Sequence, residues 1–88
     1  MVVEVSLLVG KQHIRICFWL YSVVDRVLNL EENRIATIEN DDTLNRVIGV
    51  IADDAQFNSG YPEYVEQCAQ FIKLLKSQPL PITINVLD

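Results

Sequence analysis

Residues 2–21 read VVEVSLLVGKQHIRICFWLY, two apolar runs on either side of Gly10-Lys11, and this stretch decides the predicted fold. Both runs are rich in β-branched and aromatic residues, as strands are. A glycine at the first central position of a two-residue loop is typical of a tight hairpin turn. We therefore predict an N-terminal β-hairpin whose second strand ends near Leu20 or Tyr21.

The register of this hairpin separates its side chains into two faces. One face is almost wholly apolar and consists of Val3, Val5, Leu7, Val9, Gln12, Ile14, Ile16 and Phe18. The outer face consists of Val2, Glu4, Ser6, Leu8, His13, Arg15, Cys17 and Trp19, with Tyr21 beyond them. A slip of one residue would move Ile14 and Ile16 to the polar face, so the pattern favours this register.

The rest of the chain follows helical and strand periodicities in turn. Residues 22–30 fit a short helix with Ser22 as its N-cap, although their valines leave a third strand over 23–30 open. Residues 31–33 are polar and predict a turn. Beyond them we predict a strand, two helices capped in part by Asn40-Asp41-Asp42, and a final strand, over 34–39, 43–56, 62–76 and 82–87.

This order of elements predicts an α+β fold. We expect a mixed sheet of about four strands, with two main helices packed on one face in a two-layer sandwich. A chain of 88 residues is short for two domains, so we expect a single domain over 1–88.

The net charge, the lengths of the apolar runs and the cysteine spacing argue against several classes of partner. The formal net charge of −5 argues against nucleic acid, because phosphate binding needs clustered cations. No apolar run approaches the roughly 20 residues that cross a membrane, so we expect no membrane partner.

Cys17 and Cys68 lack a CxxC spacing or a nearby histidine, so no metal site is expected. We predict reduced thiols in a cytoplasmic protein, with a disulfide left open.

Catalytic chemistry is poorly supported. Nucleophilic hydrolysis by serine or cysteine needs a histidine as base, and His13 is the only one, on the polar face of the hairpin. Gly10, Gly49 and Gly60 lie too far apart to form a phosphate-binding loop. We therefore expect no enzyme, no catalytic residue and no cofactor.

Two carboxylate pairs draw attention. Asp41-Asp42 precede a predicted helix, where they cap it and complement its dipole. Asp53-Asp54 lie near the end of the same helix, where carboxylates oppose the dipole. Neither pair has the spacing of a calcium loop. The second pair is therefore a candidate recognition site, with plain solvated surface as the alternative.

These observations predict a small acidic protein-binding module, such as an adaptor, an immunity or inhibitor protein, or a regulatory subunit. Its partner is another protein or itself, as a homodimer or higher oligomer formed through the hairpin. The candidate binding residues are Trp19, Tyr21, Leu8, Asp53 and Asp54, because aromatic residues are frequent at binding hot spots. The alternative for Trp19 and Tyr21 is burial beneath a helix of the same chain.

A second prediction is a small-ligand sensor or carrier. Its pocket would lie between the sheet and the helices, with Tyr61, Tyr64 or Asp54 at the mouth. Phe57 adds a third aromatic residue to this part of the chain. The alternative is an ordinary helix–helix corner packed by aromatic side chains.

Overall fold

The computed structural model describes residues 3–87, and their arrangement is α+β. Its elements in chain order are β1 (Glu4–Val9), β2 (Gln12–Cys17), α1 (Phe18–Leu28), α2 (Leu30–Asn33), β3 (Ile35–Ile38), α3 (Asp41–Phe57), α4 (Pro62–Ser77) and β4 (Ile82–Val86). The strands form one sheet in the order β2-β1-β4-β3. Within residues 3–87, no helix is long and apolar enough to cross a membrane.

The predicted hairpin and its register are confirmed. β1 and β2 pair antiparallel from Glu4 opposite Cys17 to Val9 opposite Gln12, as the sequence pattern requires. Gly10 has a φ of 61°, a left-handed conformation that a residue without a Cβ adopts readily. The register would also pair Val3 with Phe18 and Val2 with Trp19, but Phe18 and Trp19 belong to α1 and lie outside this ladder, and Val2 lies outside the described part of the chain.

The predicted end of the second strand is wrong, because β2 ends at Cys17 and α1 begins at Phe18. The predicted N-cap, Ser22, lies inside α1, and Cys17 is the N-cap instead, its Sγ accepting a hydrogen bond from the backbone N–H of Leu20 at 3.5 Å. Helical spacing turns Leu20 and Tyr21 into the core together, which a strand cannot do because adjacent side chains of a strand point to opposite faces.

Residues 29–33 also differ from the prediction. The chain leaves α1 through Asn29 in a left-handed conformation and forms the short helix α2 where a polar turn was expected. The third strand considered over 23–30 is absent, because that range belongs mainly to α1. Within α2, Leu30 is fully buried and joins the core.

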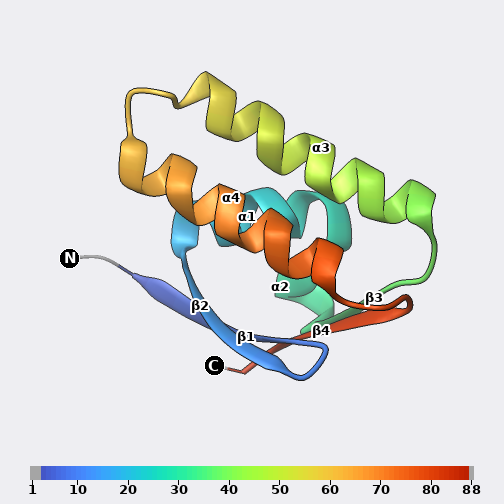
Figure 1. The fold of residues 1–88 in the computed structure, drawn as a ribbon. Helices are drawn as coiled ribbons and strands as arrows, with labels where there is room; N and C mark the ends of the chain where they lie inside the picture. The colour runs from blue at the N-terminus through green and yellow to red at the C-terminus, as the bar shows by residue number, and fades with distance from the viewer. Residues whose placement is uncertain (1–2, 88) are drawn as a thin grey trace.

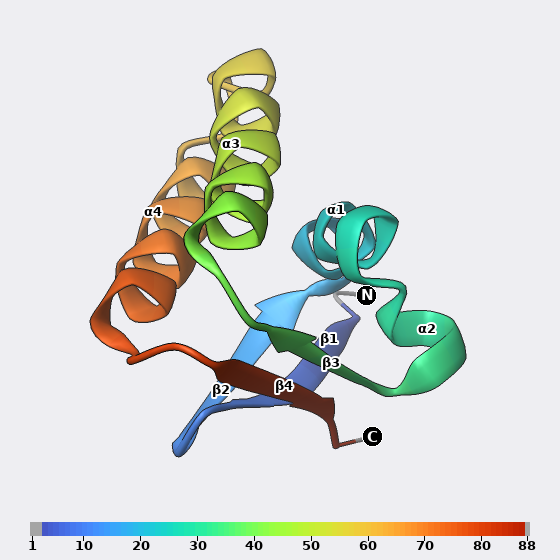
Figure 2. The ribbon, with the colours of Figure 1, turned by 90° about the vertical axis from the view of Figure 1, so that its right-hand side faces the viewer.

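The expected mixed sheet is wrong, because every strand pair in the described chain is antiparallel. The connection between β3 and β4 explains this. α3 leads away from the end of β3, α4 returns alongside it, and β4 therefore starts where β3 ended and runs back beside it (Figure 2).

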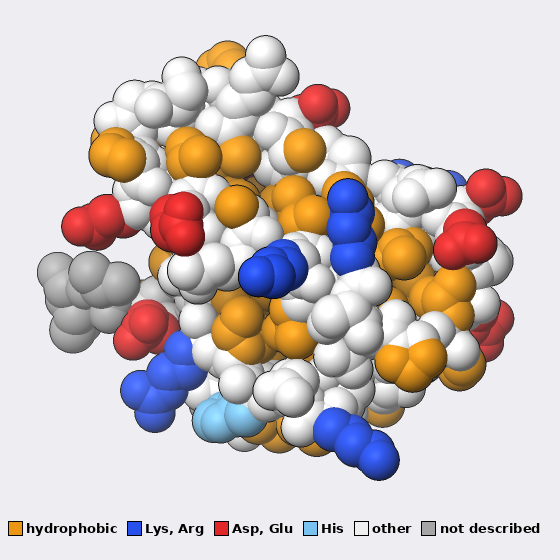
Figure 3. Space-filling model, in the orientation of Figure 1, with side chains coloured by type: hydrophobic (Ala, Val, Ile, Leu, Met, Phe, Trp, Pro, Cys, Tyr) orange, Lys and Arg blue, Asp and Glu red, His pale blue; other side chains and the backbone are white. Residues whose placement is uncertain are grey.

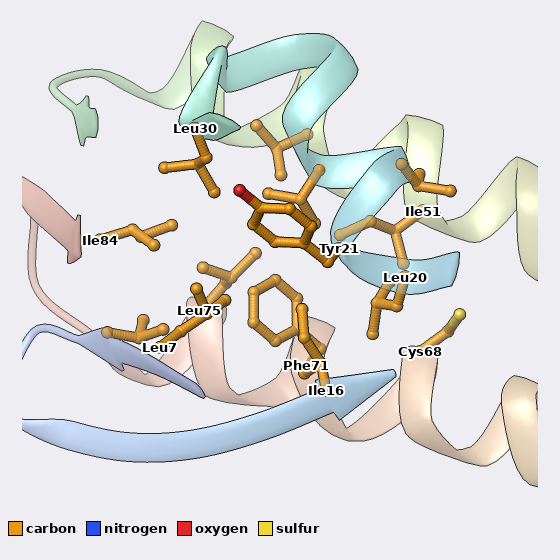
Figure 4. Packing of buried hydrophobic residues seen from close by; sticks show 14 of the residues in the cluster. Leu7, Ile16, Leu20, Tyr21, Leu30, Ile51, Cys68, Phe71, Leu75 and Ile84 are labelled. Atoms are coloured by element: carbon orange, nitrogen blue, oxygen red, sulfur yellow. The ribbon is translucent and has the colours of Figure 1, made fainter. Parts of the chain in front are cut away.

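The long helices α1, α3 and α4 are drawn above the strands, and α2 lies beside β3 (Figures 1 and 2). α3 packs against both α1 and α4, so the three long helices form a connected group above the strands. Apolar side chains from the sheet and the helices fill the space between them, with Phe71, Leu7 and Leu20 among the fully buried ones (Figure 4).

The remaining predicted elements are confirmed. The side chain of Asn40 caps α3 by accepting a hydrogen bond from the backbone N–H of Thr43 at 2.9 Å. α4 begins with Pro62 in its first turn, where the lack of an N–H costs nothing. The end of α3 and the start of α4 lie at the same end of the molecule, where the candidate site is found.

Candidate functional site

Asp54 connects three helices at the end of the molecule where α1 begins, α3 ends and α4 begins. Its Oδ2 accepts a hydrogen bond from Trp19 Nε1 of α1 at 2.9 Å and another from the Tyr64 hydroxyl of α4 at 2.6 Å. The Asn58 amide donates to the same oxygen at 3.2 Å and to the Asp54 carbonyl at 2.8 Å. One carboxylate oxygen therefore holds both aromatic side chains by their polar ends.

The charge of Asp54 is stabilised by these donors. Burial alone raises the pKa of this carboxyl, but the hydrogen bonds from Tyr64 and Trp19 and the charge of Arg26 outweigh it, so the pKa lies below its ordinary value of 3.8. The Arg26 guanidinium stands 3.8 Å from Asp54 Oδ1 and its side chain is 65% exposed, so this ion pair adds little. Asp54 is therefore ionised at neutral pH.

The same interactions keep Tyr64 protonated. Burial raises the pKa of its hydroxyl, and the hydrogen bond to Asp54 raises it further. The neighbouring Cys68 thiol is buried, and burial raises its pKa as well. Tyr64 therefore acts as a hydrogen-bond donor here and does not serve as a base.

A hollow of about 420 Å³ opens beside this junction. It is lined by Cys17, Trp19, Asn58, Tyr61 and Tyr64. The ring centroids of Trp19 and Tyr64 are 6.3 Å apart and their planes are nearly perpendicular, at 82°. Trp19 and Tyr61 are 59% and 68% exposed, so their rings are open to a ligand. We call this space the aromatic hollow.

Two further hollows continue from it along the start of α4. The first, of about 470 Å³, shares Cys17, Tyr61 and Tyr64 with the aromatic hollow and adds Glu4 and Glu63. The next is lined by Pro62, Glu63, Glu66, Gln67 and Gln70. We call the three together the trough.

The trough is acidic. None of the described residues that line it is lysine or arginine. Figure 3 shows acidic side chains on the left, where α4 begins, and others on the right, with basic side chains over the middle of the molecule and below. The charged residues that line the trough are Glu4, Glu63 and Glu66, so it carries negative charge.

Four of the residues predicted for a site come together here. Trp19 and Asp54 were predicted for protein binding, and Tyr61, Tyr64 and Asp54 for a ligand, and the structure places all four at one location. The ligand pocket was predicted between the sheet and the helices, but core side chains fill that space. The aromatic hollow lies instead at the end of the helices.

Three other predicted residues lie elsewhere. Tyr21 was expected on the outer face of the hairpin, but it is only 3% exposed and its hydroxyl donates to Glu31 Oε2 at 2.6 Å. Leu8 is half-buried on β1, opposite His13, and Asp53 is exposed on α3 beside the junction. Trp19 and Tyr21 therefore lie on α1, and of the residues predicted for protein binding Leu8 lies on the hairpin.

Asn58, Cys17 and Gln67 belong to this site but were not predicted as site residues. Asn58 is the C-cap of α3 with a φ of −105°, which is not the left-handed conformation that favours asparagine, so its role left no clear signal in the sequence. The Gln67 side chain accepts a hydrogen bond from the backbone N–H of Cys17 at 2.8 Å, which ties the start of α1 to α4. A contact between residues 50 positions apart leaves no local trace in the sequence.

This arrangement suits binding by ring faces and shape. Both cysteines are free, with Cys68 buried and Cys17 half-buried. In the described residues, no three or more His, Cys, Asp or Glu side chains come together as metal ligands.

Comparisons of this chain with protein-family models, with curated proteins and with solved structures find no match.

Proposed function

We propose that this chain is a small acidic protein-binding module that receives a basic segment of its partner in the trough. The observation that carries the proposal is the pairing of exposed aromatic rings, Trp19 and Tyr61, with the neighbouring carboxylates Glu4 and Glu63. Aromatic anchors supply most of the energy of protein interfaces, and complementary charge supplies specificity and a fast association rate.

The junction at Asp54 supports this role because it fixes the anchor before binding. A hydrogen bond to a carboxylate holds the Trp19 indole, so less side-chain freedom is lost when a partner docks on it. The proposal gives the module no catalytic role, and it includes the two-layer packing of helices on sheet, a cytoplasmic location and reduced thiols. The module acts as an adaptor, inhibitor or regulatory subunit.

A random peptide library displayed on phage tests the proposal. The selected peptides are expected to be basic, and their affinity is expected to fall about 5-fold or more for Glu63→Lys, which replaces an attraction by a repulsion of about 1 kcal/mol. Asp53→Lys is the matched control, since it makes the same change of charge outside the trough, and it should leave the affinity within a factor of about two.

Two results would overturn the proposal. One is that no two selected peptides compete with each other for binding to the wild-type protein. The other is an equal loss of affinity for the two charge reversals, which would show only a general attraction between an acidic protein and basic peptides. Circular dichroism and light scattering establish that each variant is folded and has the same oligomeric state as the wild type.

A small-molecule ligand is the second candidate. The volume of the aromatic hollow, about 420 Å³, lies in the range of small-molecule pockets, which supports it. The extension of the hollow into an acidic trough favours a longer, basic ligand. Saturable binding of a free metabolite, together with no trough-dependent peptide, would favour the small-molecule function.

A further inference from the structure

The aromatic hollow has the composition of a site for an organic cation. Three aromatic side chains, those of Trp19, Tyr61 and Tyr64, line one space. Aromatic rings carry negative potential on their faces and attract cations placed within about 6 Å of the ring centre. The Trp19 and Tyr64 rings meet edge to face, with planes at 82° and centroids 6.3 Å apart, so they form two walls of a corner in which a cation can contact both.

The carboxylate that holds two walls of the hollow is already engaged by its neighbours. Asp54 Oδ2 accepts three hydrogen bonds, from the side chains of Trp19, Tyr64 and Asn58. A primary ammonium that entered the hollow would lose water and find this oxygen occupied. An ammonium whose hydrogens are replaced by methyl groups has no such hydrogen bonds to lose.

Asp54 also increases the attraction of the rings. The Tyr64 hydroxyl donates to the carboxylate at 2.6 Å, and the Trp19 N–H donates at 2.9 Å. A donor that faces a negative charge is polarised, and electron density shifts toward its ring. Asp54 is therefore a positioning residue that orients two walls and makes them more negative.

We propose that the aromatic hollow seats the trimethylammonium group of a methylated lysine in the bound partner. The assignment rests on the proposed function, since the acidic trough beyond Tyr61 receives the chain that carries this lysine. Glu4 and Glu63 complement basic residues beside it. The long, unbranched stem of lysine allows its head to enter the hollow while the peptide backbone stays in the trough.

The first experiment tests the cation itself with two small probes of equal shape. Choline and its uncharged carbon analogue 3,3-dimethylbutan-1-ol are titrated at constant ionic strength. The chain has one tryptophan, Trp19, so its fluorescence reports the hollow directly. We expect choline to bind about 3- to 30-fold more tightly than the analogue, the range that a cation–π contact provides. Equal binding, or no binding of choline, overturns the proposal.

The variants Tyr61→Ala and Phe57→Ala locate the site. Tyr61 lines the hollow, so its truncation should weaken choline at least about 3-fold. Phe57 is a matched aromatic control, 88% exposed and not among the lining residues, and its truncation should leave choline binding unchanged. The opposite pattern, with Phe57→Ala alone weakening choline, places the cation elsewhere and overturns the assignment.

The second experiment tests the source of the cation. Each lysine of a trough-binding peptide is replaced in turn by trimethyl-lysine and by its neutral carbon analogue. We expect one position at which only the charged form raises the affinity, by about 3-fold or more. Choline binding without such a position overturns the assignment to a partner's side chain. Intact peptide binding without any choline preference overturns the cation seat and leaves the proposed function standing.

Discussion

Replacing Asp54 with alanine removes the acceptor that connects α1, α3 and α4. The loss is dominated by Tyr64, whose hydroxyl is half-buried and donates to the carboxylate at 2.6 Å. A hydrogen bond to a charged group contributes about 1.5 to 3 kcal/mol. Trp19 is 59% exposed, so water replaces much of its bond. We expect the variant to lose about 2 to 3 kcal/mol of unfolding free energy.

A loss of this size leaves a measurable folded state, since a chain of 88 residues has a stability of roughly 4 to 13 kcal/mol. Urea unfolding at pH 7, followed by circular dichroism, measures it. Asp53→Ala is the matched control, because Asp53 is exposed, and it should change the stability by less than about 0.5 kcal/mol. Similar losses for the two variants, or a loss below about 0.5 kcal/mol for Asp54→Ala, would refute the reasoning.

The wild type and the Asp54→Ala variant also test how the stability depends on pH. The folded-state pKa of Asp54 lies below its ordinary value of 3.8, so its charge stabilises the fold above that pH. The contribution is lost as the pH falls through the folded-state pKa. The stability difference between wild type and Asp54→Ala should therefore shrink below about pH 4. A difference that stays constant down to pH 2 would contradict the assignment.

Two further predictions concern the fold. Gly10→Ala should cost about 1 to 2 kcal/mol in urea unfolding, because φ is 61° there, a conformation that residues with a Cβ rarely adopt. Gly60→Ala, with open space around it, should cost less than about 1 kcal/mol, and equal costs would contradict the turn geometry. Tyr21→Phe should flatten the alkaline limb of stability. Burial and the hydrogen bond to Glu31 raise the pKa of Tyr21 to about 12, so the wild type loses stability as the pH rises from about 10 to about 12, and an unchanged limb in the variant would contradict this origin.

The hairpin was predictable because two local signals agree. The turn at Gly10 fixes which residues face each other, and the alternation around it allows one register only. The start of α1 was not predictable from the same stretch. Phe18 and Trp19 favour a strand by propensity, and cysteine is an unusual N-cap.

Individual residues of the candidate site were predictable from the sequence, but the way the fold brings them together was not. Asp54 drew attention because a carboxylate near a helix C-terminus opposes the dipole, and the structure supplies the compensation, three donors on one oxygen. Those donors lie on three segments, and Trp19 is 35 residues from Asp54. The antiparallel order of the sheet depends in the same way on how α3 and α4 return the chain to β3.

The most direct measurement of the central claim is an NMR titration of the ¹⁵N-labelled protein with a selected basic peptide. The indole N–H of Trp19 and the backbone amides of residues 58–61 and 63–67 are expected to shift together and to saturate at one peptide per chain. Shifts confined to the outer face of the strands, around His13 and Arg15, with Trp19 unmoved, would contradict the trough as the binding site.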